Sequence, residues 1–412
     1  MANGKHIHRN QLDTILTHRF WGLLVFIGIV WLMFWATFTL GGYPQKWIEN
    51  LMGLLSDYVS RMMDEGWLRD FLQNGLINGV GSVLAFLPNI LILFLFISTL
   101  EESNYLPRAA KLMDKYMHGI GLHGSSFIPL LMGFGCNVPA IMATRSIERR
   151  NDRILTMMMI PYIPCSARIP TFVLLVGTFF PGDTVLAMMG LYLGSILTGI
   201  AIALITKRIF FREKSEDYEI PLPPLKIPGT AMALKGMWDA ASEYLRKIGT
   251  VVLIAVIVVW ALDYFPLERH NAVAEEVPAS YLEDFGHAVE PVMAPLGFDW
   301  KMSAALITGI AAKEFIVGTL GVLYQDSGHS DIGLGERMKN EVTVTGEKVM
   351  DKANALSFVI FALIYMPCVA TAAAIRKESG SAKWSVITIC TTLAAAWLLS
   401  FAAYHVGMII WG

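Results

Sequence analysis

The chain has 412 residues, of which 55% are hydrophobic and only 16% are charged, with a formal net charge of −2. This composition is too apolar for a soluble globular protein, and the near-zero net charge excludes a nucleic-acid-binding surface. All four cysteines lie in apolar segments, which favours reduced, membrane-buried thiols over a disulfide framework.

Nine apolar stretches follow one another along the chain, and several exceed the length of about 18 residues that a membrane span needs. The first is expected to be a retained span and not a signal peptide, because no small-residue cleavage site follows it. The stretches lie at 20–41, 77–100, 125–143, 154–180, 184–206, 248–265, 302–323, 354–375 and 384–411.

The charges of the connecting loops set the orientation of these stretches. Lys and Arg gather in the N-terminus and in one set of loops, which we place in the cytoplasm by the positive-inside rule: 101–124, 144–153, 207–247 and 376–383. Asp and Glu predominate in a second set, which we place outside: 42–76, 266–301 and 324–353. The stretches 125–143 and 302–323 then each begin and end on one side, so both are expected to be re-entrant. Seven spans remain, with the N-terminus cytoplasmic and the C-terminus outside.

The two halves of the chain repeat one order of elements in opposite orientation: a span, a re-entrant stretch, a span broken at Pro-Cys, and a last span. An inverted repeat places its solute at the bilayer midplane, where the broken elements meet. We therefore expect an all-α polytopic membrane protein with two inverted gate repeats, re-entrant broken helices and one extra N-terminal span. Its parts are 1–76 (N-terminal span and external amphipathic region), 77–206 (first gate repeat), 207–247 (cytoplasmic linker and interfacial helix) and 248–412 (second gate repeat).

Three cysteines stand beside helix-breaking residues at membrane depth. They are Cys136 in the run 133–139, Cys165 in 164–170 and Cys368 in 366–371. A helix broken inside a bilayer leaves backbone groups without partners unless protein or a water-filled cavity supplies them, so such breaks mark solute pathways. A thiol at a break indicates a soft or borderline metal ion as the solute, such as Fe²⁺, whereas Mg²⁺ and Ca²⁺ prefer oxygen ligands alone.

Further polar side chains accompany these thiols. Asn137 and Ser166 offer oxygen ligands next to Cys136 and Cys165. Lys313 and Glu314 lie inside the second re-entrant stretch, where charges are rare and functional by default. For Glu314, a ligand role and a pairing with Arg168 stand as alternatives. The candidate metal ligands are therefore Cys136, Cys165, Cys368, Asn137, Ser166 and Glu314, whereas Cys390 is expected to be a small core residue.

The sequence contains no Gly-x-x-x-x-Gly-Lys-Ser/Thr run, no Ser-His-Asp pattern and no HExxH. Nothing in this chain is therefore expected to cradle a nucleotide phosphate or to act as an enzyme. We expect a transporter with no permanently bound cofactor.

Long stretches resemble the ferrous iron transport protein B family, and the resemblance extends from about residue 12 to residue 410. The matching runs are 86–110, 121–153, 161–170, 311–324 and 366–378. The resemblance implies Fe²⁺ uptake across the bacterial inner membrane, along a pathway near Cys136, Cys165 and Cys368, with Glu314 in the second gate.

Two departures from the family pattern affect these expectations. In the family a GTP-binding domain normally precedes the first span, whereas here the first predicted span begins at residue 20. Either the gene is split, with a separate soluble GTP-binding protein, or this chain is a truncated form. The expected partners are the lipid bilayer, a separate GTP-binding protein and a small SH3-like protein, and a homo-oligomer is an open alternative. Family members also often carry Lys at Ser125 and Gln at Asn89. The alternative functions are transport of another divalent metal or a nucleoside, and a membrane subunit that does not transport.

Overall fold

The structure is a computed structural model. It describes residues 16–411 except for 17, 19, 65, 79–80, 82–83, 86, 212–223, 227, 248–252, 266–279, 325–333 and 341–349. Within these residues every regular element is a helix, which confirms the predicted all-α class.

The helices follow the chain in a simple order. In the first half they are α2 (Trp21–Met62), α3 (Trp67–Asp70), η1 (Phe71–Asn78), α5 (Leu87–Glu102), α6 (Leu106–Gly119), η2 (Gly124–Ser126), α7 (Phe127–Gly133), α8 (Asn137–Ala143), η3 (Thr144–Ser146), α9 (Arg150–Met159), η4 (Ile160–Tyr162), η5 (Ser166–Arg168), α10 (Ile169–Phe179) and α11 (Thr184–Phe210). In the second half they are α12 (Thr230–Lys247), α13 (Leu253–Tyr264), α15 (Tyr281–Met293), η7 (Ala294–Leu296), α16 (Trp300–Ala311), α17 (Phe315–Leu323), α18 (Leu334–Asn340), α19 (Lys352–Ile364), α20 (Val369–Ser379) and α21 (Ala382–Trp411).

The first helix is longer than the predicted first span. α2 continues through Pro44 to Met62, so the helix extends beyond the apolar stretch 20–41, whose end as a membrane span stays a prediction. The glycine near this position serves a helix crossing and not a turn, because a Cβ on Gly41 would collide with the Asn89 side chain of α5. Asn89 Nδ2 in turn donates to Gln45 Oε1 of α2 at 2.8 Å.

Five helical segments of the described chain are long and apolar enough to cross a membrane, which makes the protein a multi-pass membrane protein. They are Trp21–Met62, Arg150–Phe179, Thr184–Phe210, Lys352–Ser379 and Ala382–Trp411. A sixth arises if α5 and α6, bent by 91°, count as one broken span. The described residues do not provide all seven predicted spans. The predicted span 248–265 corresponds to α13, which has only 12 described residues, because 248–252 lie outside the described part.

Both predicted re-entrant stretches are pairs of short helices joined at a break. In the first, α7 packs against α8, and in the second, α16 packs against α17. The arms α7 and α8 have seven residues each, or about 10 Å at 1.5 Å per residue, which is far short of a bilayer core of about 30 Å. Their placement as re-entrant elements in a bilayer stays a prediction.

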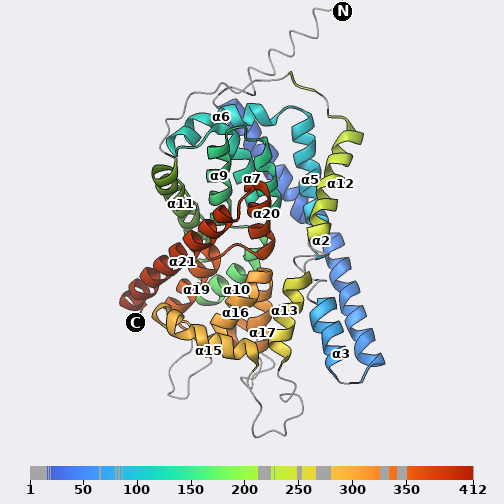
Figure 1. The fold of residues 1–412 in the computed structure, drawn as a ribbon, viewed down its shortest axis with the longest axis vertical. Helices are drawn as coiled ribbons and strands as arrows, with labels where there is room; N and C mark the ends of the chain where they lie inside the picture. Colours follow the sequence, from blue (N-terminus) through green and yellow to red (C-terminus); the bar gives the residue numbers. More distant parts are fainter. Residues whose placement is uncertain are drawn as a thin grey trace, which may run out of the picture.

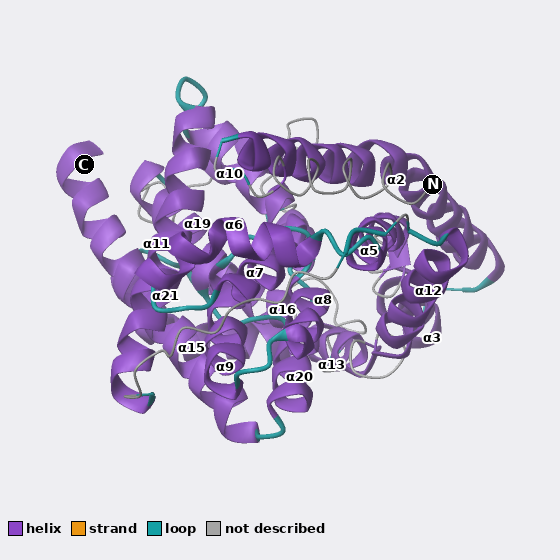
Figure 2. Cartoon of the chain, turned by 90° about the horizontal axis from the view of Figure 1, so that it is seen from above, coloured by secondary structure: helices purple, strands orange, loops and turns teal. Residues whose placement is uncertain are grey.

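The two broken spans run in opposite directions. In Figure 1, α9 lies in the upper part of the molecule and α10 in the lower part, whereas α19 lies low and α20 high. The two halves also interlock, because α8 contacts α20 and α10 contacts α19. Seen from above, α7, α8 and α16 lie in the middle, and α2, α5 and α12 gather on one side (Figure 2).

Two loops that the charge pattern places in the cytoplasm meet at the upper end of the molecule. Arg145 Nε donates to Glu378 Oε2 at 2.7 Å, and Arg153 Nη2 donates to the main-chain oxygen of Glu378 at 2.7 Å. The loop 144–153 therefore lies beside the end of α20, on one side of the molecule.

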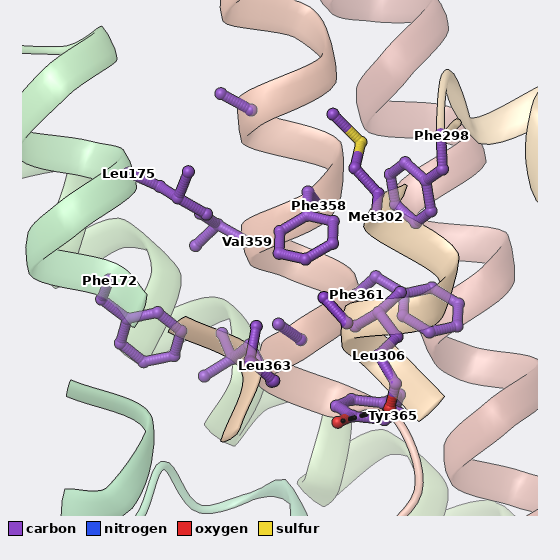
Figure 3. Packing of buried hydrophobic residues seen from close by; sticks show 14 of the residues in the cluster. Phe172, Leu175, Phe298, Met302, Leu306, Phe358, Val359, Phe361, Leu363 and Tyr365 are labelled. Atoms are coloured by element: carbon purple, nitrogen blue, oxygen red, sulfur yellow. Dashed lines mark hydrogen bonds between the residues drawn. The ribbon is translucent and has the colours of Figure 1, made fainter. Parts of the chain in front are cut away.

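The apolar core joins residues from both halves. Figure 3 shows Phe172 and Leu175 of α10 facing Val359 and Leu363 of α19, with Met302 of α16 behind them. A second cluster, between α8, α9 and α20, includes the partly buried Cys136 and Cys368. Close packing in both clusters fixes the breaks relative to each other.

Two connecting segments pack more closely than expected. α12 runs beside α5, where a Cβ on Gly236 would lie 2.8 Å from Ser98 Oγ, and its place at the membrane interface stays a prediction. The predicted external loop 324–353 contains α18, which packs on α10 and buries Met338 completely. Residues 212–223 and 227 of the predicted linker lie outside the described residues.

Candidate functional site

The first break separates α9 from α10 and is tied to the break between α7 and α8. Pro161 and Pro164 lack main-chain N–H groups, so the helix cannot continue through this segment. Ser166 donates twice to the carbonyl oxygen of Gly135, from its main-chain N at 3.2 Å and from Oγ at 2.8 Å. One carbonyl freed by the first re-entrant break is thus satisfied by the neighbouring break.

Each of the three predicted gate thiols lies directly before a helix. Cys136 precedes α8, Cys165 precedes η5 and Cys368 precedes α20, and none of the three side chains caps its helix. The Cys368 Sγ lies 3.1 Å from the hydroxyl of Thr371, one turn further along α20. Cys165 is buried, and the other two are partly buried.

The three thiols gather from separate breaks into one region, which we call the thiol cluster (Cys136, Cys165 and Cys368). Cys136 lies within electrostatic reach of the two other thiols and of Glu314. Among the described residues, no three His, Cys, Asp or Glu side chains lie close enough to hold a metal ion. The thiols are therefore neighbours and not a closed ligand set.

The oxygen ligands proposed from the sequence differ in their surroundings. The Asn137 Oδ1 is buried and has no hydrogen-bond partner among the described residues. The Ser166 hydroxyl is engaged with Gly135, as described above. Glu314 is partly buried, and the alternative pairing with Arg168 does not form in the described part of the chain, because the guanidinium binds main-chain oxygens instead.

Arg168 links the two breaks to each other. Its Nη1 donates to the main-chain oxygen of Leu363 at the end of α19, and to that of Pro161 at 3.3 Å. The side chain is only 2% exposed, so this cation lies in the interior and is held by carbonyl oxygens. The guanidinium thus satisfies backbone acceptors that the broken helices leave open.

The second break, between α19 and α20, is contacted by a second buried cation. Lys313, between α16 and α17, donates from Nζ to the main-chain oxygen of Met366 at 2.7 Å. Its Nζ also lies 3.2 Å from the centroid of the Tyr365 ring. The Tyr365 hydroxyl donates to the Leu306 oxygen at 3.2 Å, the dashed line in Figure 3.

Sequence reasoning missed Tyr365, the Met366 carbonyl and Thr371. Thr371 follows Cys368 by three residues at a helix start, a spacing that brings the two side chains together. No sequence signal points to Tyr365, since a tyrosine in an apolar stretch is more often core. The expectation that Cys390 is a core residue is wrong, because this residue is exposed on α21.

A cavity of about 290 Å³ lies beside the start of α7, at the end of the molecule that the charge pattern places in the cytoplasm. Glu101, Ser125, His123 and Asp152 are among the residues that line it. His123 caps η2 and lies with its Nε2 3.9 Å from Asp114 Oδ1, while Gly124 N donates to the same oxygen at 2.8 Å. These contacts give the histidine a structural role at this turn.

Two family models match the chain. One, Gate, described as "Nucleoside recognition", matches residues 83–179 and 245–382. The other, described as "Ferrous iron transport protein B C terminus", matches residues 188–239. The two parts of the gate match contain the breaks described above, one pair in each part.

Curated relatives align with nearly the whole chain. It is 43% identical to a Porphyromonas gingivalis "Fe(2+) transport protein A/Fe(2+) transporter FeoB fusion protein", over 97% of this chain and 52% of the relative. It is 37% identical to the Fe(2+) transporter FeoB of Campylobacter jejuni, over 97% of this chain and 65% of the relative. For the Staphylococcus aureus (strain COL) transporter the identity is 36%, over 98% of this chain and 60% of the relative. The chain thus spans between half and two thirds of these relatives, and no solved structure matches it.

Proposed function

Because the chain belongs to the FeoB family of Fe(2+) transporters, whose membrane gate region it represents, we propose that it carries Fe²⁺ across the bacterial inner membrane through the thiol cluster. Iron is then the transported substrate and not a resident cofactor. The observation that supports this path is the gathering of Cys136, Cys165 and Cys368 from three separate helix breaks.

The chemistry of the donors suits a borderline divalent ion in transit. Thiols select soft and borderline ions, and Asn137 Oδ1 adds a harder ligand that has no hydrogen-bond partner among the residues that the structure describes. We propose that Glu314 and Ser166 complete this set as the ion passes. An incomplete ligand set is compatible with transport, because conduction requires binding that is weak enough for the ion to leave.

We also propose that the two halves are inverted repeats, with the N-terminus in the cytoplasm. The opposite directions of α9–α10 and α19–α20, and the contact of loop 144–153 with Glu378, support this arrangement. In such a fold the solute site lies near the midplane, where the breaks of both repeats meet.

The proposed partners follow from the relatives. The family resemblance is the ground on which we propose that transport is coupled to a separate GTP-binding protein. One relative is named as a fusion with Fe(2+) transport protein A, and we propose a small SH3-like partner of that kind. A homo-oligomer remains a further proposal.

The proposal is tested by Fe²⁺ flux into liposomes that contain the purified chain and an entrapped iron-sensitive dye, under reducing, anaerobic conditions. The double variant Cys136→Ser with Cys368→Ser is expected to lose at least about tenfold in flux, since serine oxygen is a poor substitute for a soft thiolate. Cys390→Ser is the matched control, because this thiol is exposed on α21. Unchanged flux in the double variant, with a normal control, would disprove the proposed ion path through the thiol cluster.

A nucleoside is the second candidate substrate, favoured by the description of the matching gate family. The thiol cluster argues for the metal, since a nucleoside has no need of soft ligands. Fe²⁺, Mn²⁺, Zn²⁺ and a nucleoside compete in the same flux assay, and inhibition by the nucleoside alone would favour the second candidate.

A further inference from the structure

Lys313 occupies a position with the features of a cation-binding seat. We use this term for the main-chain oxygen of Met366 and the ring face of Tyr365, which contact the Lys313 Nζ at 2.7 Å and, to the ring centroid, 3.2 Å. A carbonyl oxygen and an aromatic face are neutral groups that attract cations. Lys313 is only 3% exposed, so the seat lies inside the protein.

The seat is held in place independently of the lysine. The Tyr365 ring stacks on Phe361, with centroids 5.5 Å apart and planes at 27°, and its hydroxyl donates to the Leu306 oxygen at 3.2 Å. Figure 3 shows Tyr365 at the end of α19, below Phe361 and Leu306. Gly309 leaves room for this hydroxyl, because a Cβ there would collide with it. The seat therefore keeps its shape when its occupant moves away.

The seat adjoins the thiol cluster. Lys313 lies within electrostatic reach of Cys368 and Cys165, and of the charged side chains of Arg168 and Glu314. Its ammonium makes no ion pair with a carboxylate in the described part of the chain. A buried charge without a close counter-charge is costly, so the ammonium depends on the Met366 oxygen and the Tyr365 ring of the seat.

We propose that Lys313 is a tethered cation that fills the seat in the empty protein and is displaced when a divalent ion enters the thiol cluster. This inference rests on the proposed function. Cysteine binds metal ions as thiolate, so the thiols release their protons to solvent as the ion enters, whereas the ammonium fills the seat in the empty protein. An incoming Fe²⁺ repels the ammonium and gains the Met366 oxygen as a further ligand.

Because the ion must displace Lys313, its affinity for the site is lower than the affinity that the ligands alone would provide. The return of Lys313 to its seat competes with the ion and favours release, which a pathway requires. Removing the charge is therefore expected to raise the affinity for the ion and to lower the flux. If Lys313 had only a structural role, its removal would lower both the affinity and the flux.

The first test measures Co²⁺ binding to the purified full chain in detergent, through the thiolate-to-Co²⁺ absorption band. Lys313→Met is expected to bind Co²⁺ about tenfold or more tightly than the wild type, because a like charge beside the ion has been removed. Lys313→Arg keeps the charge and is expected to stay near the wild-type affinity. Lys301→Met is the matched control, since Lys301 lies over the Tyr324 ring at 4.9 Å, at the other end of α16.

The second test uses flux in liposomes and the unmodified protein. Fe²⁺ flux of Lys313→Met is expected to fall while its Co²⁺ affinity rises. In the wild type, labelling of Lys313 by an amine-reactive reagent, read by peptide mass spectrometry, is expected to rise at least threefold when Co²⁺ saturates the protein. This second readout needs no variant and therefore does not depend on how Lys313→Met folds.

The outcomes separate this inference from the proposed function. If Cys136→Ser with Cys368→Ser keeps the thiolate band and the flux, the thiol path itself fails. If that variant loses both, but Lys313→Met binds Co²⁺ no more tightly and Lys313 labelling ignores Co²⁺, only the tethered cation is overturned.

Discussion

The first break, between α9 and α10, gives a small uncharged donor to the neighbouring re-entrant pair: Ser166 donates twice to the Gly135 oxygen, between α7 and α8. The second break, between α19 and α20, uses a charged donor, since Lys313 donates to the Met366 oxygen and lies over the Tyr365 ring. Both solutions connect a re-entrant pair of helices to the neighbouring broken span. The positions of donor and acceptor are exchanged, because the donor lies in the broken span of the first half and in the re-entrant pair of the second.

This difference shows that an identical order of helices does not impose identical chemistry. A broken helix in an apolar interior requires only that its carbonyl oxygens find donors. A hydroxyl meets that requirement without adding charge, whereas an ammonium also adds a charge that interacts electrostatically with the nearby thiols. In the proposed path, the second break is therefore the one where ion binding and the backbone contacts depend on each other.

The largest expected loss of stability comes from Arg168→Ala, which removes the link between the breaks. The free energy of unfolding in detergent is expected to fall by about 2–5 kcal/mol, because two buried carbonyl oxygens lose a donor and a cavity forms. Arg208→Ala, in the last turn of α11 and exposed, is the control. A loss no larger than that of the control would mean that contacts other than those of Arg168 hold the two breaks together.

A pair of glycine variants compares the two breaks, with an expected loss in the free energy of unfolding that is intermediate between the other predictions. A Cβ on Gly133 of α7 would lie 3.3 Å from the Ile163 side chain, whereas a Cβ on Gly309 of α16 would collide with Ile316 and the Tyr365 hydroxyl. Gly309→Ala is expected to cost about 1–3 kcal/mol by overpacking. Gly133→Ala is expected to stay within about 1 kcal/mol of the wild type, because alanine favours the helix and Ile163 can adjust.

Thermal unfolding of both glycine variants in the same detergent measures the difference. Equal destabilisation would show that the second break adapts as easily as the first, against the rigid seat inferred for Tyr365. Fe²⁺ flux, measured in parallel, is expected to fall more in Gly309→Ala, since a displaced Tyr365 alters the seat of Lys313.

Among the variants that remove a hydrogen-bond donor, Ser166→Ala is expected to have the smallest effect. The main-chain N–H of residue 166 still donates to the Gly135 oxygen, so the free energy of unfolding is expected to fall by only about 0.5–1.5 kcal/mol. Thr178→Ala is a suitable reference, because that hydroxyl also donates to a carbonyl oxygen, within its own helix, at 2.6 Å. A loss as large as that of Arg168→Ala would mean that the first break depends on its hydroxyl and not on its backbone.

The sequence predicted well those features that depend on local apolarity and on helix-breaking residues. The apolar stretches at 154–180, 184–206, 354–375 and 384–411 each correspond to a membrane-length segment, because length and hydropathy are local properties. The breaks at Cys136, Cys165 and Cys368 also lie where proline and glycine placed them. Apolarity alone does not mark the end of α2, which continues through Pro44 to Met62, beyond the apolar stretch 20–41.

The sequence by itself determined a helical membrane protein with thiols at three breaks, because apolar runs and missing N–H groups act on the backbone wherever it lies. Only the tertiary structure decided which groups meet at those breaks. Ser166 and Gly135 are 31 residues apart, Lys313 and Met366 are 53 apart, and Arg168 and Leu363 are 195 apart. Contacts over such distances depend on how the two halves interlock, and no local pattern encodes which carbonyl a buried cation will reach.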